Sequence, residues 1–330
     1  MKKKLVFLTN PIHPAVQAEL ETFAQVSVAP STRNEDLIAG AEHASVIVVR
    51  HPLPPALFTR AKNLVGAVRH GAGVDMIPLE VASQHHVAVA NAPGANARTV
   101  AEFAVGQMLA LAHKSAAINA RMRNMGWAGA RALADQGFDL AGRVVGLVGT
   151  GAIGQAVANM CHSGFGMKVI GYRPSGPPPL DIIASASLAD VFAKADFIVL
   201  ACPLNEKTRG LVNRTLLKSM KPTACLVNVA RGAVVDQDAL VESLVAGDIA
   251  GAALDVFTLQ PLPAQSPLYR MENVLLSPHM AGITEDSLQA VGFCVARQVR
   301  QLLRGELPEH LVNREVTPAI ERRLSVLTAS

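Results

Sequence analysis

Short apolar runs alternate with amphipathic segments along this chain, and that alternation limits the fold more than any other feature of the sequence. Segments with helical spacing, such as 15–23 and 54–61, separate runs that have the length and apolar content of buried strands. In the first hundred residues these runs are 5–8, 45–50, 64–69 and 87–90. Parallel strands need crossover connections of this kind, so the pattern predicts βαβ units and a mostly parallel sheet.

A second α/β series follows a long helical pattern, which runs from about 98 to 123 and ends before a loop that carries Gly126, Trp127 and Gly129. Its six strand candidates are 143–149, 168–172, 197–201, 224–230, 251–256 and 274–277. Six strands with intervening helices predict a doubly wound sheet. The last strong helical pattern, about 284–304, is expected to pack back on the first domain. The tail after Pro308 is weakly patterned, and we expect it to be partly mobile.

Composition removes several classes of protein. Half of the 330 residues are hydrophobic and 17% are charged, which excludes disorder, and the length suggests two domains. A diffuse net charge of +4 predicts no nucleic-acid partner, and the apolar runs are too short to predict a membrane span. The apolar run after Lys2, Lys3 and Lys4 is also too short for a signal peptide, so we expect a cytoplasmic protein. The four cysteines lack CxxC spacing and predict buried thiols with no metal.

The clearest motif is a GxGxxG turn between a buried strand and a helix. It consists of Gly149, Thr150, Gly151, Ala152, Ile153 and Gly154. In this setting the first glycine permits the tight turn, the second lets a pyrophosphate approach the backbone, and the third allows close packing of helix on strand. The motif therefore predicts a dinucleotide-binding site.

The residues after the next strand indicate which dinucleotide binds. An NAD site places Asp or Glu about 20 residues past the motif, to bind the ribose hydroxyls. This chain instead has Arg173, Pro174 and Ser175, with Arg173 19 residues beyond Gly154. A guanidinium can pair with a 2′-phosphate, so the sequence favours NADP over NAD. The alternative is an exposed arginine that contacts nothing and leaves both cofactors usable.

Three later segments complete a resemblance to a known family. They read VNVARG at 227–232, LDVFTLQPLP at 254–263 and SPHMAG at 277–282. Together with the GxGxxG unit, in this order and spacing, they make the chain resemble the D-isomer-specific 2-hydroxyacid dehydrogenase family along nearly its whole length. The resemblance implies an α/β fold in which a Rossmann cofactor domain with a doubly wound parallel sheet, 99–286, is inserted into a flavodoxin-like substrate domain, 1–98 and 287–330.

The resemblance also assigns the catalytic residues. Arg231 matches the arginine that holds the substrate carboxylate, a task suited to a planar guanidinium that binds bidentately. His279 matches the proton donor for the alkoxide that forms when hydride arrives, because imidazole titrates near neutral pH.

Position 260 departs from the family pattern. The motif expects a Glu that pairs with the histidine, and this chain has Gln260, as formate dehydrogenases of the same superfamily do. An amide can still orient the ring by accepting from Nδ1–H, but it supplies no negative charge, so we expect His279 to be less basic. The alternative is that Gln260 substitutes geometrically with little kinetic effect.

The remaining site residues also follow from the resemblance. Ala72 and Gly73 match the substrate loop, whose backbone N–H groups receive a carboxylate, and Arg50 matches a substrate-contacting position unless it forms a surface salt bridge. Asp255 matches the partner of the nicotinamide carboxamide unless it only caps the turn after its strand. The other predicted cofactor contacts are Cys202, Pro203, Thr208, Val229 and Ala230.

The leading functional hypothesis is an NAD(P)-dependent reductase of a small 2-oxo acid, with glyoxylate and hydroxypyruvate as the expected substrates. A second hypothesis keeps the fold and changes the substrate to 3-phosphoglycerate or a longer 2-hydroxy acid. A third is a non-catalytic protein that senses nicotinamide nucleotides, as related corepressors do. The resemblance also implies a homodimer, for which the helix at 98–123 and the Trp127 loop offer an apolar surface.

Overall fold

The computed structural model describes residues 3–329 and divides into two compact units. Unit 1 comprises the chain as far as Asn96 and again from Ile283, and unit 2 comprises Ala97–Gly282. The boundaries expected from the sequence, at 98/99 and 286/287, lie two and four residues further along the chain. No helix in the described part of the chain is both long and apolar enough to cross a membrane.

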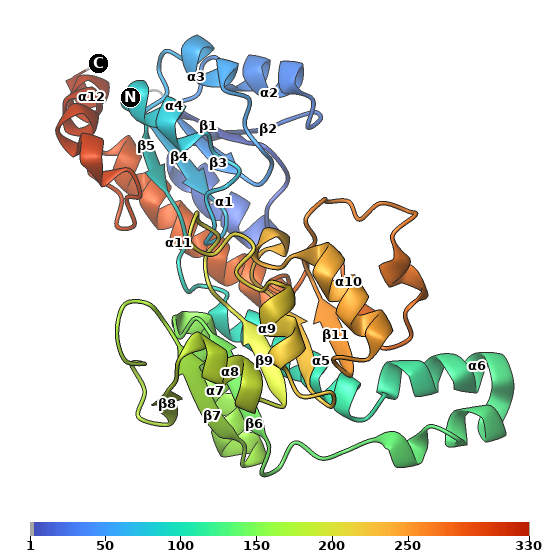
Figure 1. Cartoon of the computed structure of the whole chain (residues 1–330). Helices are drawn as coiled ribbons and strands as arrows, with labels where there is room; N and C mark the ends of the chain where they lie inside the picture. The colour runs from blue at the N-terminus through green and yellow to red at the C-terminus, as the bar shows by residue number, and fades with distance from the viewer. Residues whose placement is uncertain (1–2, 330) are drawn as a thin grey trace. The chain divides into compact units, whose positions relative to one another are not determined.

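Unit 1 is built on a five-stranded parallel sheet (Figure 1). Its strands lie in the order β2-β1-β3-β4-β5, the flavodoxin-like order. They are β1 (Leu5–Leu8), β2 (Gln25–Val28), β3 (Val46–Val49), β4 (Gly66–Arg69) and β5 (Ala88–Ala90). The helices are α1 (Pro14–Phe23), α2 (Asn34–Ala41), α3 (Ala56–Arg60), α4 (Leu79–Gln84), α11 (Glu285–Leu303) and α12 (Thr317–Ala329), with a 3-10 turn η5 (Arg314–Val316).

Apolar side chains on both faces explain why these strands form a central sheet. All four residues of β3 are buried, as expected for a parallel strand covered by helices on both sides. One face packs with Val16 and Leu20 of α1 and with the apolar side of α11. The other packs with Leu37 of α2 and Leu57 of α3. The strand ends are therefore the part of this sheet that side chains and loops can use for binding.

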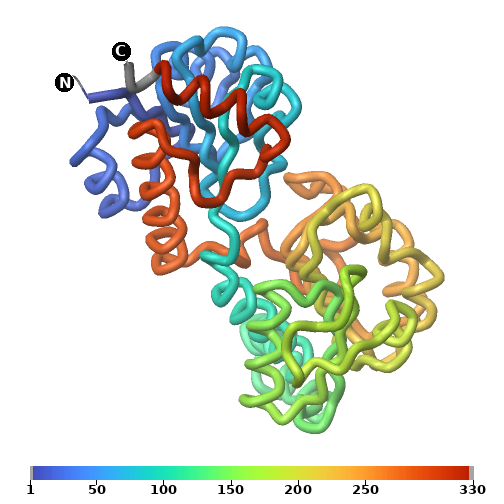
Figure 2. Tube along the Cα trace, turned by 90° about the vertical axis from the view of Figure 1, so that its left-hand side faces the viewer, coloured from blue at the N-terminus to red at the C-terminus, as the bar shows by residue number. Residues whose placement is uncertain are grey.

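The C-terminal segment is part of unit 1 and not a loose tail, which corrects the expectation of mobility after Pro308. Helix α12 buries Ile320 and Leu324, at 0% and 1% exposure. Before it, the buried Asn313 accepts from Val89 N and donates to Val87 O, both at 2.9 Å. Figure 2 shows this red segment alongside the blue strands of the same unit. The hydrophobic periodicity of the segment after Pro308 is weak because only these few side chains are buried, so the sequence did not indicate that the segment is packed.

Unit 2 contains a seven-stranded parallel sheet in the order β12-β11-β10-β9-β6-β7-β8. The strands are β6 (Val144–Val148), β7 (Lys168–Tyr172), β8 (Ile183–Ser185), β9 (Phe197–Leu200), β10 (Cys225–Asn228), β11 (Gly251–Leu254) and β12 (Val274–Leu276). The helices are α5 (Ala97–Ala112), α6 (Ser115–Arg131), α7 (Ala152–Asn159), α8 (Leu188–Lys194), α9 (Arg214–Ser219) and α10 (Gln237–Ala246). Shorter turns are η1 (Ala134–Gln136), η2 (Met160–Gly164), η3 (Gly232–Val234) and η4 (Pro267–Arg270). The doubly wound class is confirmed.

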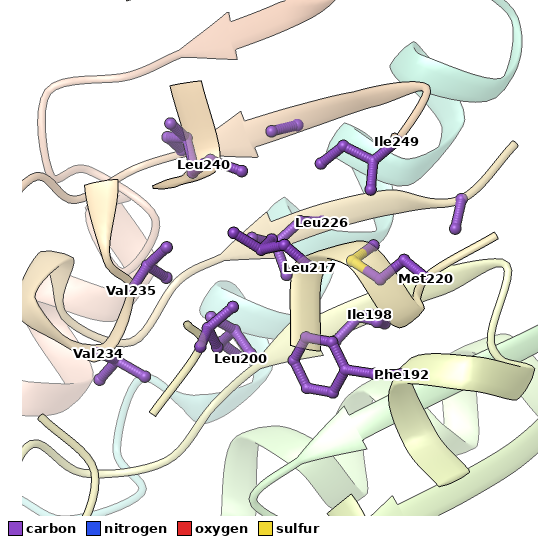
Figure 3. Close-up of a cluster of buried hydrophobic side chains, with 14 of the residues drawn as sticks. Phe192, Ile198, Leu200, Leu217, Met220, Leu226, Val234, Val235, Leu240 and Ile249 are labelled. Atoms are coloured by element: carbon purple, nitrogen blue, oxygen red, sulfur yellow. The ribbon is translucent and has the colours of Figure 1, made fainter. Parts of the chain in front are cut away.

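Two hydrophobic clusters cover the faces of this sheet. Figure 3 shows part of one, in which side chains from the strands, among them Ile198, Leu200 and Leu226, meet Phe192 and Leu240 from helices α8 and α10. The other cluster packs α5 and α7 against the opposite face. The chain order of the strands reverses between β6 and β9, and ligands of doubly wound sheets bind outside the carboxyl ends of the strands at such a point.

Three local predictions were wrong. The helix expected at about 98–123 is two helices, α5 and α6, because Lys114 takes a left-handed conformation with φ 52°. The loop expected around Trp127 belongs to α6, which kinks at Gly126, where φ is 71°. Strands β2 and β8 were missed because they are three or four residues long and at most one residue of each is buried.

Candidate active site

The residues of unit 2 that the sequence singled out follow the carboxyl ends of its strands. The glycine turn follows β6, Arg173 follows β7 and Cys202 follows β9. Arg231 follows β10, Gln260 comes after β11 and His279 after β12. Because all these strands are parallel, their carboxyl ends form one edge of the sheet, and the predicted residues share that edge.

The three glycines of the turn after β6 have different tasks. Gly149 has φ 98°, and a Cβ there would lie 2.8 Å from the carbonyl of Ala201. A Cβ at Gly154 would lie 2.3 Å from Gly149 O, so this position lets α7 approach the strand. Gly151 instead precedes α7 without a side-chain cap and has nothing within 4 Å of its would-be Cβ. That open backbone at a helix start fits a dinucleotide pyrophosphate.

Thr150 gives independent support for a ligand at this turn. Its side chain is 1% exposed, and its Oγ1 has no hydrogen-bond partner within residues 3–329. A buried hydroxyl without a protein partner is costly, and such a group in a native protein usually bonds to a bound ligand or water. A dinucleotide bound at the turn would bring polar groups close to this hydroxyl.

Arg173 follows β7 where an NAD-binding site would carry a carboxylate. Its Nε donates to Ser175 Oγ at 2.8 Å, and it forms no ion pair in the described part of the chain. Ser175 thus holds a guanidinium whose charge is not neutralised by a neighbouring carboxylate. This arrangement fits a 2′-phosphate better than two free ribose hydroxyls.

The loop after β9 is organised by Thr208. Its hydroxyl donates to Pro203 O at 2.7 Å and accepts from Asn205 N at 2.8 Å, so the loop closes on itself. Cys202 is half-buried at the start of this loop, and burial raises the pKa of its thiol. The thiol is therefore protonated at neutral pH, which agrees with a packing role.

Two residues that the sequence analysis left without a role shape the loop of Arg231. Asn228 is 1% exposed; its Oδ1 accepts from Ala230 N at 3.0 Å and its Nδ2 donates to Arg231 O at 3.2 Å. A Cβ at Gly232 would lie 1.9 Å from the carbonyl carbon of Phe257. The loops after β10 and β11 can touch only because position 232 has no side chain. Both residues lie inside the 227–232 motif, but their side-chain types alone did not indicate these tasks.

His279 and Gln260 form the central pair. Nδ1 of His279 lies 3.0 Å from Oε1 of Gln260, while Nε2 of Gln260 donates to Phe257 O at 3.4 Å. Because the amide nitrogen faces a carbonyl, its oxygen faces the ring, and Nδ1 must be the donor. Nε2 of His279 is then the atom that gains or loses a proton, as a general acid or base requires. The expectation that the amide orients the ring is consistent with this geometry.

Asp255 holds the loop on which His279 lies. Its carboxylate is 2% exposed and accepts from Ser277 Oγ at 2.7 Å, from Met280 N at 2.8 Å and from Ala281 N at 2.9 Å. Its backbone oxygen accepts from His279 N at 2.8 Å. His279 itself has φ 55°, a left-handed conformation that few residues other than glycine adopt. These bonds stabilise the left-handed backbone at His279. The sequence predicted only a carboxamide contact for Asp255, so this role is an addition.

Unit 1 carries the other predicted substrate residues at its own carboxyl edge. Arg50 follows β3; its guanidinium donates to Pro11 O, and it forms no ion pair within residues 3–329. The predicted loop with Ala72 and Gly73 follows β4. It is held from β5 by Asn91, whose side chain donates to Ala72 O.

His70 adds a buried imidazole to this loop. It is 6% exposed, and its Nε2 has no hydrogen-bond partner in the described part of the chain. Burial, together with the positive charges of Arg50 and Arg69, lowers its pKa to about 4. His70 is therefore neutral at pH 7. Its role could not be predicted from the sequence, because a lone histidine beside a glycine loop indicates no specific chemistry.

Comparison with known proteins identifies the family of unit 2. Residues 105–281 match the model of the NAD-binding domain of D-isomer specific 2-hydroxyacid dehydrogenases. The chain is 36% identical to glyoxylate reductase of Korarchaeum cryptofilum over 83% of each sequence. It is 37% identical to D-3-phosphoglycerate dehydrogenase of Methanocaldococcus jannaschii over 93% of its own length, but it spans only 59% of that relative.

A solved structure extends the similarity to the whole fold. The NADPH-dependent glyoxylate/hydroxypyruvate reductase of Sinorhizobium meliloti, in complex with NADP and malonate, superposes with a TM-score of 0.83 at 26% identity. The match covers 94% of this chain and 97% of the other. The fold class predicted from the sequence is confirmed by this likeness.

Replacing Asp255 tests its role in holding the His279 loop. Asp255→Asn turns one acceptor oxygen into an NH2 group that faces N–H or O–H donors. We expect it to lower the free energy of unfolding by about 2–3 kcal/mol, the usual cost of losing buried hydrogen bonds to a charge. Urea denaturation followed by circular dichroism measures the change. The exposed Asp135→Asn is the matched control, and equal stability of the two variants would contradict the role.

Proposed function

The chain belongs to the D-isomer-specific 2-hydroxyacid dehydrogenase family, and from this we propose that it reduces small 2-oxo acids to D-2-hydroxy acids with a nicotinamide dinucleotide. Glyoxylate and hydroxypyruvate are the proposed substrates. The observation that carries the proposal is the hydrogen-bonded pair of His279 and Gln260, with Arg231 two strands away at the same sheet edge. The glyoxylate reductases among its relatives support the choice of substrate.

The proposed reaction needs three actions at this edge. Arg231 binds the substrate carboxylate bidentately and holds the carbonyl in a fixed plane. A reduced nicotinamide bound at the glycine turn would supply the hydride that the carbonyl carbon gains as a new C–H bond. His279, protonated on Nε2, donates that proton to the oxygen as the C=O double bond becomes C–O. The products are one D-2-hydroxy acid and one oxidised dinucleotide.

Gln260 sets the protonation of His279 in this proposal. Its oxygen fixes the ring through Nδ1 without adding a negative charge next to it. A neutral partner stabilises the imidazolium less than a carboxylate would, so the pKa of His279 is expected to be lower than with Glu at this position. The rate of reduction should therefore fall at a lower pH than it would with a Glu at position 260.

NADP is the proposed dinucleotide, although NAD fits the same glycine turn. The support is Arg173, which Ser175 holds and which has no carboxylate partner within residues 3–329. The similar reductase from Sinorhizobium meliloti is described as NADPH-dependent and was solved with NADP.

A phosphorylated hydroxy acid is the second candidate substrate. The observation that favours it is the positive charge of the arginines at the carboxyl ends of β3 and β4. Arg50 has no ion-pair partner in the described part of the chain, and its charge lowers the pKa of His70. Burial also lowers the pKa of Arg50 itself, so an added anion there would relieve an unfavourable charge. The relative from Methanocaldococcus jannaschii is named for 3-phosphoglycerate.

A homodimer is the proposed assembly. Helix α6 exposes Met122, Met125 and Trp127 by 46%, 65% and 74% of their surfaces. Adjacent exposed apolar side chains of this size are typical of an interface. Light scattering should give about twice the 34.7 kDa of one chain, and a monomer at micromolar concentration would contradict the proposal.

Turnover tests the proposal directly. The purified chain should oxidise NADPH when glyoxylate or hydroxypyruvate is added, and His279→Ala should lower kcat by at least a hundredfold because it removes the proton donor. The exposed His162→Ala should leave kcat unchanged. Binding of NADPH without turnover of any 2-oxo acid would instead support a nucleotide sensor.

A charge at position 260 should move the pH profile. Gln260→Glu places a carboxylate beside His279, which raises the pKa of the imidazole, so the fall of the reduction rate with rising pH should shift upward by about one pH unit or more. Initial rates from pH 5 to 9 measure the shift. Gln265→Glu adds the same charge at an exposed position of the same segment and should not move the profile. An unchanged profile in Gln260→Glu would mean that the amide acts only through geometry.

Removing Arg173 should separate the two dinucleotides. Arg173→Ala is expected to raise KM for NADPH by about tenfold or more, because a bidentate pair with the 2′-phosphate is lost. KM for NADH should stay within about twofold, which makes NADH the internal control. An equal change for both dinucleotides would rule out Arg173 as the phosphate-reading residue.

A further inference from the structure

A cavity of about 550 Å³ lies beside the central pair of unit 2. His279 and Gln260 both line it. The rest of the lining comes from the segment after β11, from η4 and from the end of β12. Neither Arg231 nor any residue of the glycine turn lines it, so this cavity is distinct from the predicted carboxylate and cofactor contacts.

The lining of the cavity is mostly apolar. It includes Phe257, Leu262, Tyr269 and Leu276, and no Lys, Arg, Asp or Glu is among the described residues that line it. The hydroxyl of Tyr269 donates to Leu262 O at 3.2 Å, so its hydrogen bond is made to another residue of the lining. A charged or strongly hydrated group would lose water here without a compensating partner, whereas an apolar group gains by burial.

The position of the cavity indicates which apolar group enters it. The carbonyl that His279 protonates must lie within hydrogen-bond distance of Nε2. The carbonyl carbon of a 2-oxo acid bears a carboxylate and one further substituent, and the carboxylate is assigned to Arg231. The substituent starts one bond away from the reacting carbon, so a cavity lined by His279 is within its reach.

The volume indicates the size of that group. Ligand pockets commonly measure about 300–1,000 Å³, and this one lies within that range. The hydrogen of glyoxylate or the hydroxymethyl group of hydroxypyruvate would leave most of it unfilled. A branched aliphatic or an aromatic side chain would fill more of this volume and bury more of the apolar lining.

We propose that this cavity is the side-chain subsite of the enzyme and that it selects 2-oxo acids with a branched aliphatic or aromatic substituent. The inference rests on the proposed function, since it presumes that His279 protonates a 2-oxo acid. It adds to that function a preference, among the 2-oxo acids that the enzyme reduces, for those with an apolar side chain.

The test compares kcat/KM for a series of 2-oxo acids with NADPH: glyoxylate, hydroxypyruvate, 4-methyl-2-oxopentanoate, phenylpyruvate and 3-phosphohydroxypyruvate. The subsite predicts that 4-methyl-2-oxopentanoate or phenylpyruvate exceeds glyoxylate by at least tenfold, since burying a few methylene groups gives about that discrimination. A higher value for glyoxylate, hydroxypyruvate or the phosphorylated acid overturns the subsite and leaves the proposed reductase intact. Failure to reduce any of the five acids overturns the proposed function itself.

Two variants that fill the cavity connect the preference to its lining. Leu262→Trp and Leu276→Trp should each lower the ratio of kcat/KM for 4-methyl-2-oxopentanoate to that for glyoxylate by at least tenfold. Leu259→Trp is the matched control, because Leu259 belongs to the same segment, is 65% exposed and does not line the cavity. The ratio separates a blocked subsite from a general loss of folding, which would lower both rates together. An unchanged ratio in both filling variants overturns the proposal, as does an equal fall in the control.

Discussion

The carboxylate of Asp255 is the interaction on which the candidate site of unit 2 depends. His279 has a left-handed backbone, which costs an L-residue roughly 1–2 kcal/mol. Three donors from the same loop end on the Asp255 carboxylate, and His279 N bonds to the Asp255 backbone oxygen. Hydrogen bonds to a buried charge are each worth about 1.5–3 kcal/mol, so they outweigh the strain. The loop that carries the imidazole is thus held by the residue directly after the neighbouring strand, β11.

Contact between neighbouring loops extends this arrangement along the sheet edge. Gly232 lets the loop of Arg231 lie directly against the Phe257 peptide, and the carbonyl of Phe257 in turn accepts from the amide of Gln260. The amide oxygen then meets His279. Contacts between the loops of adjacent parallel strands therefore connect the arginine, the amide and the imidazole, and the glycine at position 232 is as necessary as the reactive side chains.

The sequence predicted those parts of the molecule in which one local pattern determines the outcome. The run expected at 197–201 became a strand because it is apolar on both faces, and the glycine turn has the conformations that its motif requires. Helix α12 was not predicted, because its burial depends on Ile320 and Leu324 reaching a distant core. The break at Lys114 has no glycine or proline to mark it.

The same distinction applies to the site. The family motifs named Arg231, Gln260 and His279, and the geometry joins the last two directly. The tasks of Asn228 and Gly232 depend on which peptide lies opposite them, and that partner is about 25 residues further along the chain for Gly232. The cavity beside His279 likewise combines segments that only the fold brings together. Contacts between residues that follow different strands cannot be predicted from a local sequence pattern.

The product of the reaction tests the central claim most directly. The chain is incubated with hydroxypyruvate and NADPH, the glycerate is separated by chiral chromatography, and the NADPH consumed is measured in the same sample. The account predicts D-glycerate alone, with one dinucleotide oxidised for each glycerate formed. L-glycerate, a racemic product or NADPH loss without glycerate would contradict it.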